Sequence, residues 1–249
     1  MNRYLLVVGM AAAAAAQDGR QIMRDVQNRA KSGSQRYEGT LKVIDSKNKT
    51  TEKRWSYERI GSAGESKVVL RFSAPAEVKG VALLIVNHPE RASDQWMWTP
   101  ALQRDRRIAF QDRSTRFFGT DFSFEDLEER DVAQYDYKVM GEEKVNGRTA
   151  WKLESRPKKT KSSQYTHAHL WVDQERYVPL KIESYHDDRL IRRLHYRDYE
   201  QRQNIWTPMT LEIEDVARKS RTVLKTEKLE YNVPLKEDGF TLQALRRES

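Results

Sequence analysis

The sequence has no cysteine among its 249 residues. It therefore contains no disulfide bond, no cysteine pair for a metal and no cysteine for a lipid anchor. Its 11 glycines are scattered and form neither G-x-G-x-x-G nor a P-loop, which excludes the common phosphate-binding loops. The motifs G-x-S-x-G and H-E-x-x-H are missing too, so the sequence carries few recognisable signatures of catalysis.

Long apolar runs are also missing, except at the start of the chain. Within Met1–Gln17, Arg3 precedes the apolar stretch Tyr4–Ala16, which ends in small residues. This pattern predicts a secretory signal peptide at 1–16, because a membrane span needs roughly 20 strongly apolar residues. An uncleaved N-terminal anchor is the alternative. We expect an exported, soluble periplasmic protein whose residues 17–249 form one domain, and export argues against nucleic acid as a partner.

Charge is abundant and predominantly positive. Charged residues make up 33% of the chain and the net charge is +8. The excess is densest at Arg104, Arg106, Arg107, Arg113 and Arg116. One interpretation is a solvated surface that keeps the protein soluble. The other is a docking surface for an acidic partner, with Arg104, Arg106 and Arg107 as its centre.

The hydrophobic pattern predicts one helix followed by many strands. Asp18–Ala30 has apolar residues at helical spacing, whereas the rest of the chain alternates with a period of two. Asn146-Gly147 is the strongest hairpin signal. The predicted strands are 54–60, 67–73, 81–86, 95–99, 135–145, 148–157, 164–173, 177–186, 190–203, 205–215 and 221–233, with a short helix at 240–245. They predict a mainly β protein with one curved antiparallel sheet and one solvated face.

The stretch Thr115–Leu127 interrupts this pattern. Four phenylalanines surround Gly119 there, which favours an ordered, partly buried connection in which Ser123 caps a short helix. Asp121 and Glu125 could supply a general acid and base for a hydrolase, although capping charges explain them as well. We interpret the stretch as a lid over an apolar groove. Its proposed lid residues are Phe117, Phe118, Gly119, Phe122, Phe124 and Leu127.

His167 and His169 are the best candidates for metal ligands. Alternation places both imidazoles on one face of a strand, where His195 or Glu183 could complete a site. Two exposed histidines on a polar face are the simpler interpretation. We therefore predict no metal and no cofactor.

Large apolar side chains on strands either fill a core or line a cavity for an apolar ligand such as an acyl chain. A rolled sheet of about ten or more strands encloses more space than its own side chains readily fill, which favours a cavity. The predicted cavity-lining residues are Trp55, Tyr57, Leu70, Phe72, Leu83, Ile85, Trp96, Trp98, Leu180, Ile182, Met209 and Leu211.

Several motifs together resemble one known family. They are K-R-W-S-Y at Lys53–Tyr57, V-L-R-F-S-A-P-A-E-V-K-G at Val69–Gly80, D-Q-W-M-W-T-P-A-L at Asp94–Leu102, R-R-I at Arg106–Ile108, F-F-G-T-D-F-S-F-E-D-L at Phe117–Leu127, W-V-D-Q-E at Trp171–Glu175, P-L-K-I at Pro179–Ile182 and N-I-W-T-P at Asn204–Pro208. In order and spacing they resemble the outer-membrane lipoprotein-sorting protein family, which is similar to the periplasmic carrier LolA and the receptor LolB.

The resemblance implies an incomplete antiparallel β-barrel with helices over its concave face. It also implies a monomeric carrier of lipid or lipoprotein acyl chains that contacts membranes transiently. Its partners would be an inner-membrane RND-type exporter or an outer-membrane acceptor. A cavity arginine is implied as well, for which Arg54, Arg59 and Arg71 are candidates. Three functions remain open: an acyl-chain carrier, an envelope adaptor that docks to an exporter, and a hydrolase that uses Asp121 and Glu125.

Overall fold

The computed structural model describes residues 18–62, 64–89 and 91–247. The predicted signal peptide at 1–16 lies outside this part of the chain. In chain order, the helices and strands are α1 (Gly19–Arg29), β1 (Ser34–Ile44), β2 (Thr50–Ser62), β3 (Glu65–Ala74), β4 (Ala82–Val86), β5 (Asp94–Thr99), β6 (Arg104–Arg107), β7 (Tyr135–Val145), β8 (Arg148–Pro157), β9 (His167–Asp173), β10 (Pro179–His186), β11 (Arg189–Arg202), β12 (Ile205–Asp215), β13 (Ser220–Tyr231) and α2 (Leu242–Leu245).

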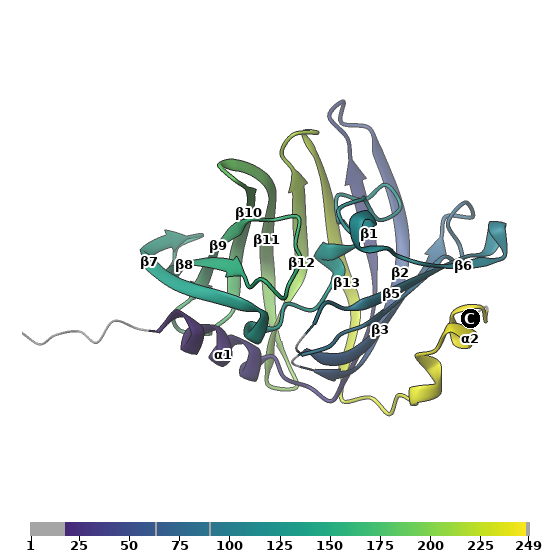
Figure 1. Cartoon of the computed structure of the whole chain (residues 1–249), viewed down its shortest axis with the longest axis horizontal. Coiled ribbons are helices and arrows are strands. Elements are labelled where there is room, and N and C mark those ends of the chain that lie inside the picture. Colours follow the sequence, from purple (N-terminus) through teal and green to yellow (C-terminus); the bar gives the residue numbers. More distant parts are fainter. Residues whose placement is uncertain (1–17, 63, 90, 248–249) are drawn as a thin grey trace, which may run out of the picture.

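All thirteen of these strands belong to one curved antiparallel sheet (Figure 1). Their order is β6-β5-β4-β3-β2-β1-β13-β12-β11-β10-β9-β8-β7, so strands that are consecutive in the chain pair with each other, except β6 and β7. The pairing of β1 with β13 joins the first and last parts of the chain. The two edge strands, β6 and β7, do not pair with each other, and the barrel is therefore incomplete. The predicted fold class is confirmed.

This topology determines where the long connection must run. Because β6 and β7 are consecutive in the chain but lie at opposite edges, the segment between them has to span the open side of the sheet. Figure 1 shows this segment, residues 108–134, passing in front of the sheet's middle strands. It contains short 3-10 turns, including Glu125–Leu127 and Val132–Gln134. We call residues 108–127 the crossing segment.

The crossing segment packs onto the inner, concave face of the first half of the sheet. Phe117 stacks on Phe72 of β3 with ring centroids 5.3 Å apart, and Phe117 and Phe124 meet edge to face at 5.6 Å. The buried cluster that results joins the segment to β1–β4, β12 and β13. Burial of each large side chain of this kind contributes roughly 1.5–3 kcal/mol. Hydrophobic packing therefore holds the segment against the sheet.

Helix α1 covers the inner face of the other half. Its Ile22 and Met23 are buried against residues of β8 and β9, among them Leu153 and Leu170. Asp18 caps the helix by accepting a hydrogen bond from the Arg20 N–H at 3.0 Å. The predicted helix at 18–30 is thus confirmed. Within the part of the chain that the structure describes, no helix is both long and apolar enough to cross a membrane.

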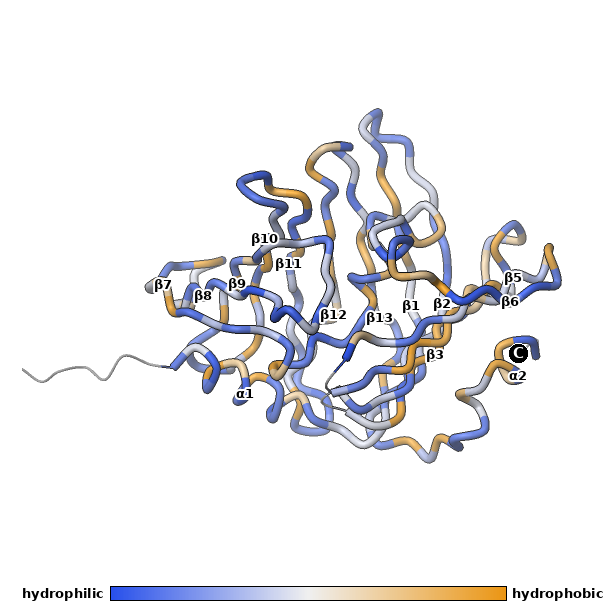
Figure 2. Tube along the Cα trace, viewed as in Figure 1, coloured by the Kyte–Doolittle hydropathy of each residue, from blue (hydrophilic) through white to orange (hydrophobic). Residues whose placement is uncertain are grey.

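The C-terminal segment packs on the outer face, on the far side of the sheet from the crossing segment. Phe240 and Leu245 are buried there against Ala82 and Leu84 of β4. Figure 2 shows apolar stretches in this terminal segment, which lies outside the concave side of the sheet. The sheet is therefore covered on both faces near β4, which explains why that strand is apolar throughout.

Candidate ligand cavity

Two cavities lie between α1 and the inner face of the sheet. The larger has a volume of about 540 Å³ and is lined from α1, β1 and β10–β13. The smaller has a volume of about 350 Å³ and extends toward β2 and the end of the crossing segment. They share five lining residues: Val26, Ala30, Gln35, Pro179 and Tyr196. The two spaces are thus adjacent parts of one hollow under α1, and the larger falls in the ~300–1,000 Å³ range of ligand pockets.

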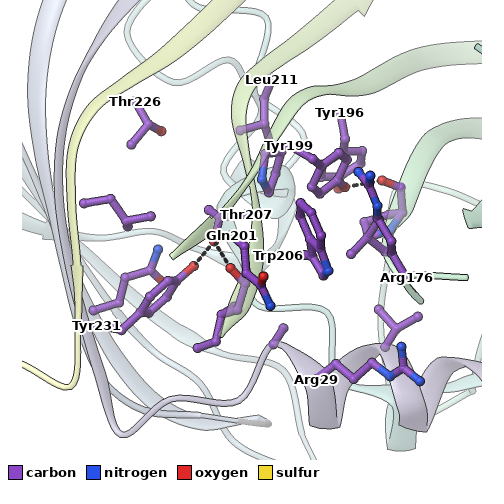
Figure 3. Close-up of a pocket in the computed structure, with 18 of the residues that line it drawn as sticks. Arg29, Arg176, Tyr196, Tyr199, Gln201, Trp206, Thr207, Leu211, Thr226 and Tyr231 are labelled. Carbon is purple, nitrogen blue, oxygen red and sulfur yellow. Dashed lines mark hydrogen bonds between the residues drawn. The ribbon is translucent and has the colours of Figure 1, made fainter. Parts of the chain in front are cut away.

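The lining of the larger cavity is mainly aromatic and aliphatic (Figure 3). Tyr196 of β11 and Leu211 of β12 are direct cross-strand partners, and Leu211 is in turn paired with Leu224 of β13. Because side chains on one face of a sheet stand side by side, this row forms an apolar wall. Val26 of α1 contributes from the helix side. An acyl chain would meet hydrocarbon and ring surfaces along this wall.

Polar groups in the cavity wall are mostly paired with one another. The hydroxyls of Thr207 and Tyr231 are 2.6 Å apart, as Figure 3 shows. The Tyr199 hydroxyl donates to the Pro179 carbonyl oxygen. Burial raises the pKa of Tyr196 to about 12, so this phenol is neutral. A neutral wall with satisfied hydroxyls suits an apolar guest, because little hydration has to be removed.

Two arginines lie at the border of the larger cavity. The Arg29 guanidinium lies 4.1 Å from the centre of the Tyr177 ring, and that of Arg176 lies 4.0 Å from the Trp206 ring. Arg29 is exposed and Arg176 is half-buried. Both rings also line the cavity. The cavity is therefore apolar inside and positively charged at this border.

The crossing segment is anchored by a buried carboxylate. Asp121 is fully buried and accepts hydrogen bonds from the hydroxyls of Ser220 at 2.5 Å and Thr222 at 2.7 Å. Arg116 forms an ion pair with it at 3.0 Å, and Arg192 donates to its backbone carbonyl oxygen. Ser220, Thr222 and Arg192 fix the segment to β13 and β11, whereas Arg116 belongs to the segment itself. Asp121 therefore anchors the segment, and its carboxylate is already bound by Ser220, Thr222 and Arg116.

A second set of contacts fixes the end of the segment. Ser123 and Asp126 exchange hydrogen bonds in a capping-box pattern: the Ser123 N–H donates to the Asp126 carboxylate at 2.8 Å, and the Asp126 N–H donates to Ser123 Oγ at 3.2 Å. Ser123 thus forms capping-type contacts as predicted, although the N-cap residue of the 3-10 turn Glu125–Leu127 is Phe124. Glu125 accepts from Ser163 Oγ and from the Gln164 N–H, and burial raises its pKa. Asp121 and Glu125 thus attach the segment to two different places, β13 and the stretch before β9.

Three comparisons place this arrangement among known proteins. A family model with the description "Uncharacterized protein" matches residues 64–247. No curated protein matches the chain by sequence. An outer membrane lipoprotein-sorting protein domain from Vibrio parahaemolyticus has 28% sequence identity and a TM-score of 0.87, with 92% of this chain and 98% of that one covered. The chain belongs to the family of that model, and it is similar in sequence and fold to this lipoprotein-sorting domain.

Other solved structures agree with this assignment. A DUF1329 family protein from Desulfovibrio piger also has 28% identity and a TM-score of 0.87, with coverage of 91% and 97%. A LolA superfamily protein from Nitrosomonas europaea has 18% identity and a TM-score of 0.74, with coverage of 92% and 100%, and shows the shared fold. The incomplete barrel described above is thus a LolA-like fold.

The structure places the predicted cavity residues in several different parts of the fold. Tyr57, Ile182 and Leu211 line the hollow under α1. A second group also lies on the inner face but is packed beneath the crossing segment or buried around it: Trp55, Leu70, Phe72, Leu83 and Ile85. Of the predicted lid residues, Leu127 lines the smaller cavity, and Phe117, Phe118, Phe122 and Phe124 belong to that same cluster. Gly119 has a φ of 74° at the turn between them.

The prediction that Trp96 and Trp98 line the cavity is wrong. Both lie on the outer face of β5, where they pack in the cluster of Phe240 and Leu245. The strand register places Met97, and not its neighbours, opposite the inward-facing Leu83. Alternation therefore turns the two indoles away from the cavity.

Leu180 and Met209 are not in the cavity wall either. A register shift between Pro179 and Lys181 leaves Leu180 out of the alternation, and it packs with Trp171 and Val178 in a separate cluster. Met209 is half-buried in β12 and is not among the residues that line the two cavities.

The sequence pattern did not indicate several residues of the cavity wall. Val26 lies in α1 and Ala30 is its C-cap residue; the pattern predicted this helix but not the part of the sheet that it covers. Tyr196 lines both cavities and was not proposed, although its position in a strand that alternates could have indicated it. Of the three candidate cavity arginines, Arg59 lines the smaller cavity and donates to Ser32 Oγ at 2.7 Å. Arg54 pairs with Glu227, and Arg71 donates to the carbonyl oxygen of Leu245.

The basic patch lies on edge strand β6. Arg106 pairs with Asp112 at 3.1 Å and Arg107 with Asp94 at 2.6 Å. Arg104 is exposed and forms no ion pair with any described residue. Charged side chains on an edge strand also discourage pairing with other sheets. A docking role for the three arginines stays a prediction.

The two candidate metal ligands lie on the outer face, away from the cavities. The possible ligand atoms of His167 and His169 lie within 4.8 Å of each other and of a Glu154 carboxylate oxygen. The third residue of this group is Glu154, whereas the sequence predicts His195 or Glu183. Arg156 already binds the Glu154 carboxylate at 2.9 and 3.1 Å. Burial, with help from Lys152, lowers the pKa of His169.

Proposed function

We propose that this protein carries lipid, or the acyl chains of lipoproteins, through the periplasm toward the outer membrane. The main support is the apolar cavity of about 540 Å³ between α1 and the inner face of the sheet. Transfer of each CH₂ group from water into such a space is favourable by about 0.8 kcal/mol. Burial of an acyl chain in the cavity is thus favourable. The described lining residues show no arrangement of groups for chemistry on that chain.

Similarity to a solved structure supports the same proposal. The lipoprotein-sorting protein domain from Vibrio parahaemolyticus has 28% identity, with 92% of this chain and 98% of that one covered. We further propose that residues 17–249 act as one domain after removal of the signal peptide at 1–16. All described strands lie in a single sheet, which is consistent with that organisation.

A movable cover would allow release of the cargo. The crossing segment packs on the inner face through Phe117, Phe122 and Phe124, and beneath it lie further apolar side chains of β2–β4. If the segment withdraws, these side chains extend the apolar surface already present under α1. We propose that cargo loading and segment withdrawal are two states of one equilibrium, whose balance a partner shifts by binding one state better.

Uptake of a labelled fatty acid by the purified mature protein tests the carrier function. We expect saturable binding, and we expect Leu211→Trp to reduce it because the indole fills the larger cavity. Thr210→Trp is the matched control, since the neighbouring residue points to the other face of β12. Thermal unfolding of both variants shows that they remain folded. Absence of uptake by the unmodified protein, or equal uptake by both variants, would contradict the proposal.

A further inference from the structure

Arg29 and Arg176 are held at the cavity border without a carboxylate partner among the described residues. The Arg29 guanidinium makes one hydrogen bond, to the Glu175 carbonyl oxygen at 3.3 Å. The Arg176 side chain makes a ring contact with Trp206. Glu175, next to Arg176 in sequence, is already bound by Arg148 at 2.8 Å, and Asp25, one turn before Arg29 in α1, accepts from Gln21 Nε2 at 3.1 Å. Neighbouring Arg148 is paired with Asp173 and Glu175, whereas Arg29 and Arg176 form no ion pair with a described carboxylate.

Their geometry leaves hydrogen-bond donors free. A guanidinium that stacks on an aromatic ring uses its flat face, and its N–H groups point outward in the plane. The turn that carries Arg176 is itself fixed, because the N–H groups of Glu175 and Arg176 both donate to Asp173 Oδ1 at 2.9 Å. Planar donors held in this way suit the paired oxygens of a phosphate or a carboxylate.

The supporting rings connect this charge to the apolar interior. Tyr177 and Trp206 both line the larger cavity, and Figure 3 shows Arg29 and Arg176 on the same side of the Trp206 ring. An amphiphile could therefore place its chain against Leu211 and Tyr196 while its headgroup stays between the two guanidinium groups. We propose that the cargo is an amphiphile with an anionic phosphate or carboxylate headgroup, which Arg29 and Arg176 select. This inference rests on the proposed carrier function.

Three ligands with the same oleoyl chain separate the contributions of chain and headgroup. They are oleate, oleoyl-lysophosphatidylglycerol and monooleoylglycerol, which carry a carboxylate, a phosphate and no charge. We expect calorimetric titration to show that at least one anionic ligand binds about tenfold more tightly than monooleoylglycerol, as charge-assisted hydrogen bonds warrant. The ranking of oleate and the phospholipid identifies which anion the site prefers.

The double variant Arg29→Gln/Arg176→Gln should remove that preference. We expect its affinity for the anionic ligands to fall to that of monooleoylglycerol, whose own binding should not change. Arg24→Gln is the matched control, because Arg24 is an exposed residue of α1 that does not line the cavity. Circular dichroism and thermal unfolding confirm that each variant is folded.

The outcomes distinguish the two proposals. Equal binding of all three ligands by the unmodified protein would overturn headgroup selection and leave the carrier function intact. Binding of none of them would overturn the carrier function. A double variant that keeps the preference, or an Arg24→Gln variant that loses it equally, would overturn the assignment to Arg29 and Arg176.

Discussion

Asp121 and Thr222 bind each other twice: the Thr222 hydroxyl donates to the Asp121 carboxylate at 2.7 Å, and the Asp121 N–H donates to the same hydroxyl oxygen at 2.8 Å. Asp121 belongs to the crossing segment, and Thr222 lies in β13 beside the pairing of the first and last strands. Both residues are fully buried. The segment that covers the inner face is therefore attached at the middle of the sheet, where both halves of the chain meet.

Asp121→Ala should strongly destabilise the fold. The substitution leaves Ser220, Thr222 and Arg116 without their shared acceptor, and loss of one partner from a buried charged pair costs about 3–5 kcal/mol. Urea unfolding measures this change in the free energy of unfolding. Asp188→Ala, at an exposed position, is the control. A loss no larger than that of the control would show that the anchor contributes little.

Ser123→Ala should produce a smaller loss. The variant removes the hydroxyl that accepts from the Asp126 N–H and from Gln164 Nε2 at 2.8 Å. Loss of a capping side chain costs about 1 kcal/mol. The same urea measurement detects it, with exposed Ser162→Ala as the matched serine control. Equal stability of the two variants would argue against a capping role.

Alternation predicted most of the sheet because each strand presents one apolar and one polar face. β7, β8 and β12 have the predicted ends, and Asn146 and Gly147 both adopt positive φ in the turn of the β7–β8 hairpin. Two strands were not predicted. In β1 a register irregularity between Glu38 and Gly39 interrupts the pattern, and β6 consists of Arg and Asp alone, so it carries no apolar signal.

The site was harder to predict, since alternation separates two faces of a strand without saying which one is concave. Trp96 and Trp98 were assigned to the cavity because they are large and lie on one face, yet the C-terminal segment covers that outer face. Phe72 does lie on the inner face, but the crossing segment fills the space above it. Both outcomes depend on where distant segments fold back, which no local pattern records.

Glu125 should make stability depend on pH. Burial raises its pKa above the usual 4.5, although hydrogen bonds from Ser163 and Gln164 and the charge of Lys161 oppose the shift. The folded protein thus binds this proton more tightly than the unfolded chain, and Glu125 lowers stability as pH rises from 4.5 through its raised pKa. Glu125→Gln removes the charge and keeps one of the two oxygens that accept from Ser163 and Gln164. Its stability relative to the unmodified protein should rise across that window and then level off.

Urea unfolding of both proteins at several pH values from 4.5 to neutrality measures this difference. Carboxylates with a lowered pKa, such as Asp173, change stability in the opposite direction in both proteins and cancel in the comparison. A difference that is independent of pH, or that falls as pH rises, would contradict the predicted shift.

Phe117→Ala and Phe240→Ala should separate the functions of the two covers of the sheet. Both side chains are nearly fully buried, so each truncation should cost about 3–5 kcal/mol of stability. Only Phe117 belongs to the crossing segment on the inner face, whereas Phe240 packs on the outer face. Phe117→Ala should therefore favour withdrawal of the segment and tighten the binding of long-chain fatty acids. Phe240→Ala should leave that binding unchanged. Titration with fatty acids of increasing length compares the two variants at a temperature where both are folded. An equal change in affinity would mean that the crossing segment does not control access to the cavity.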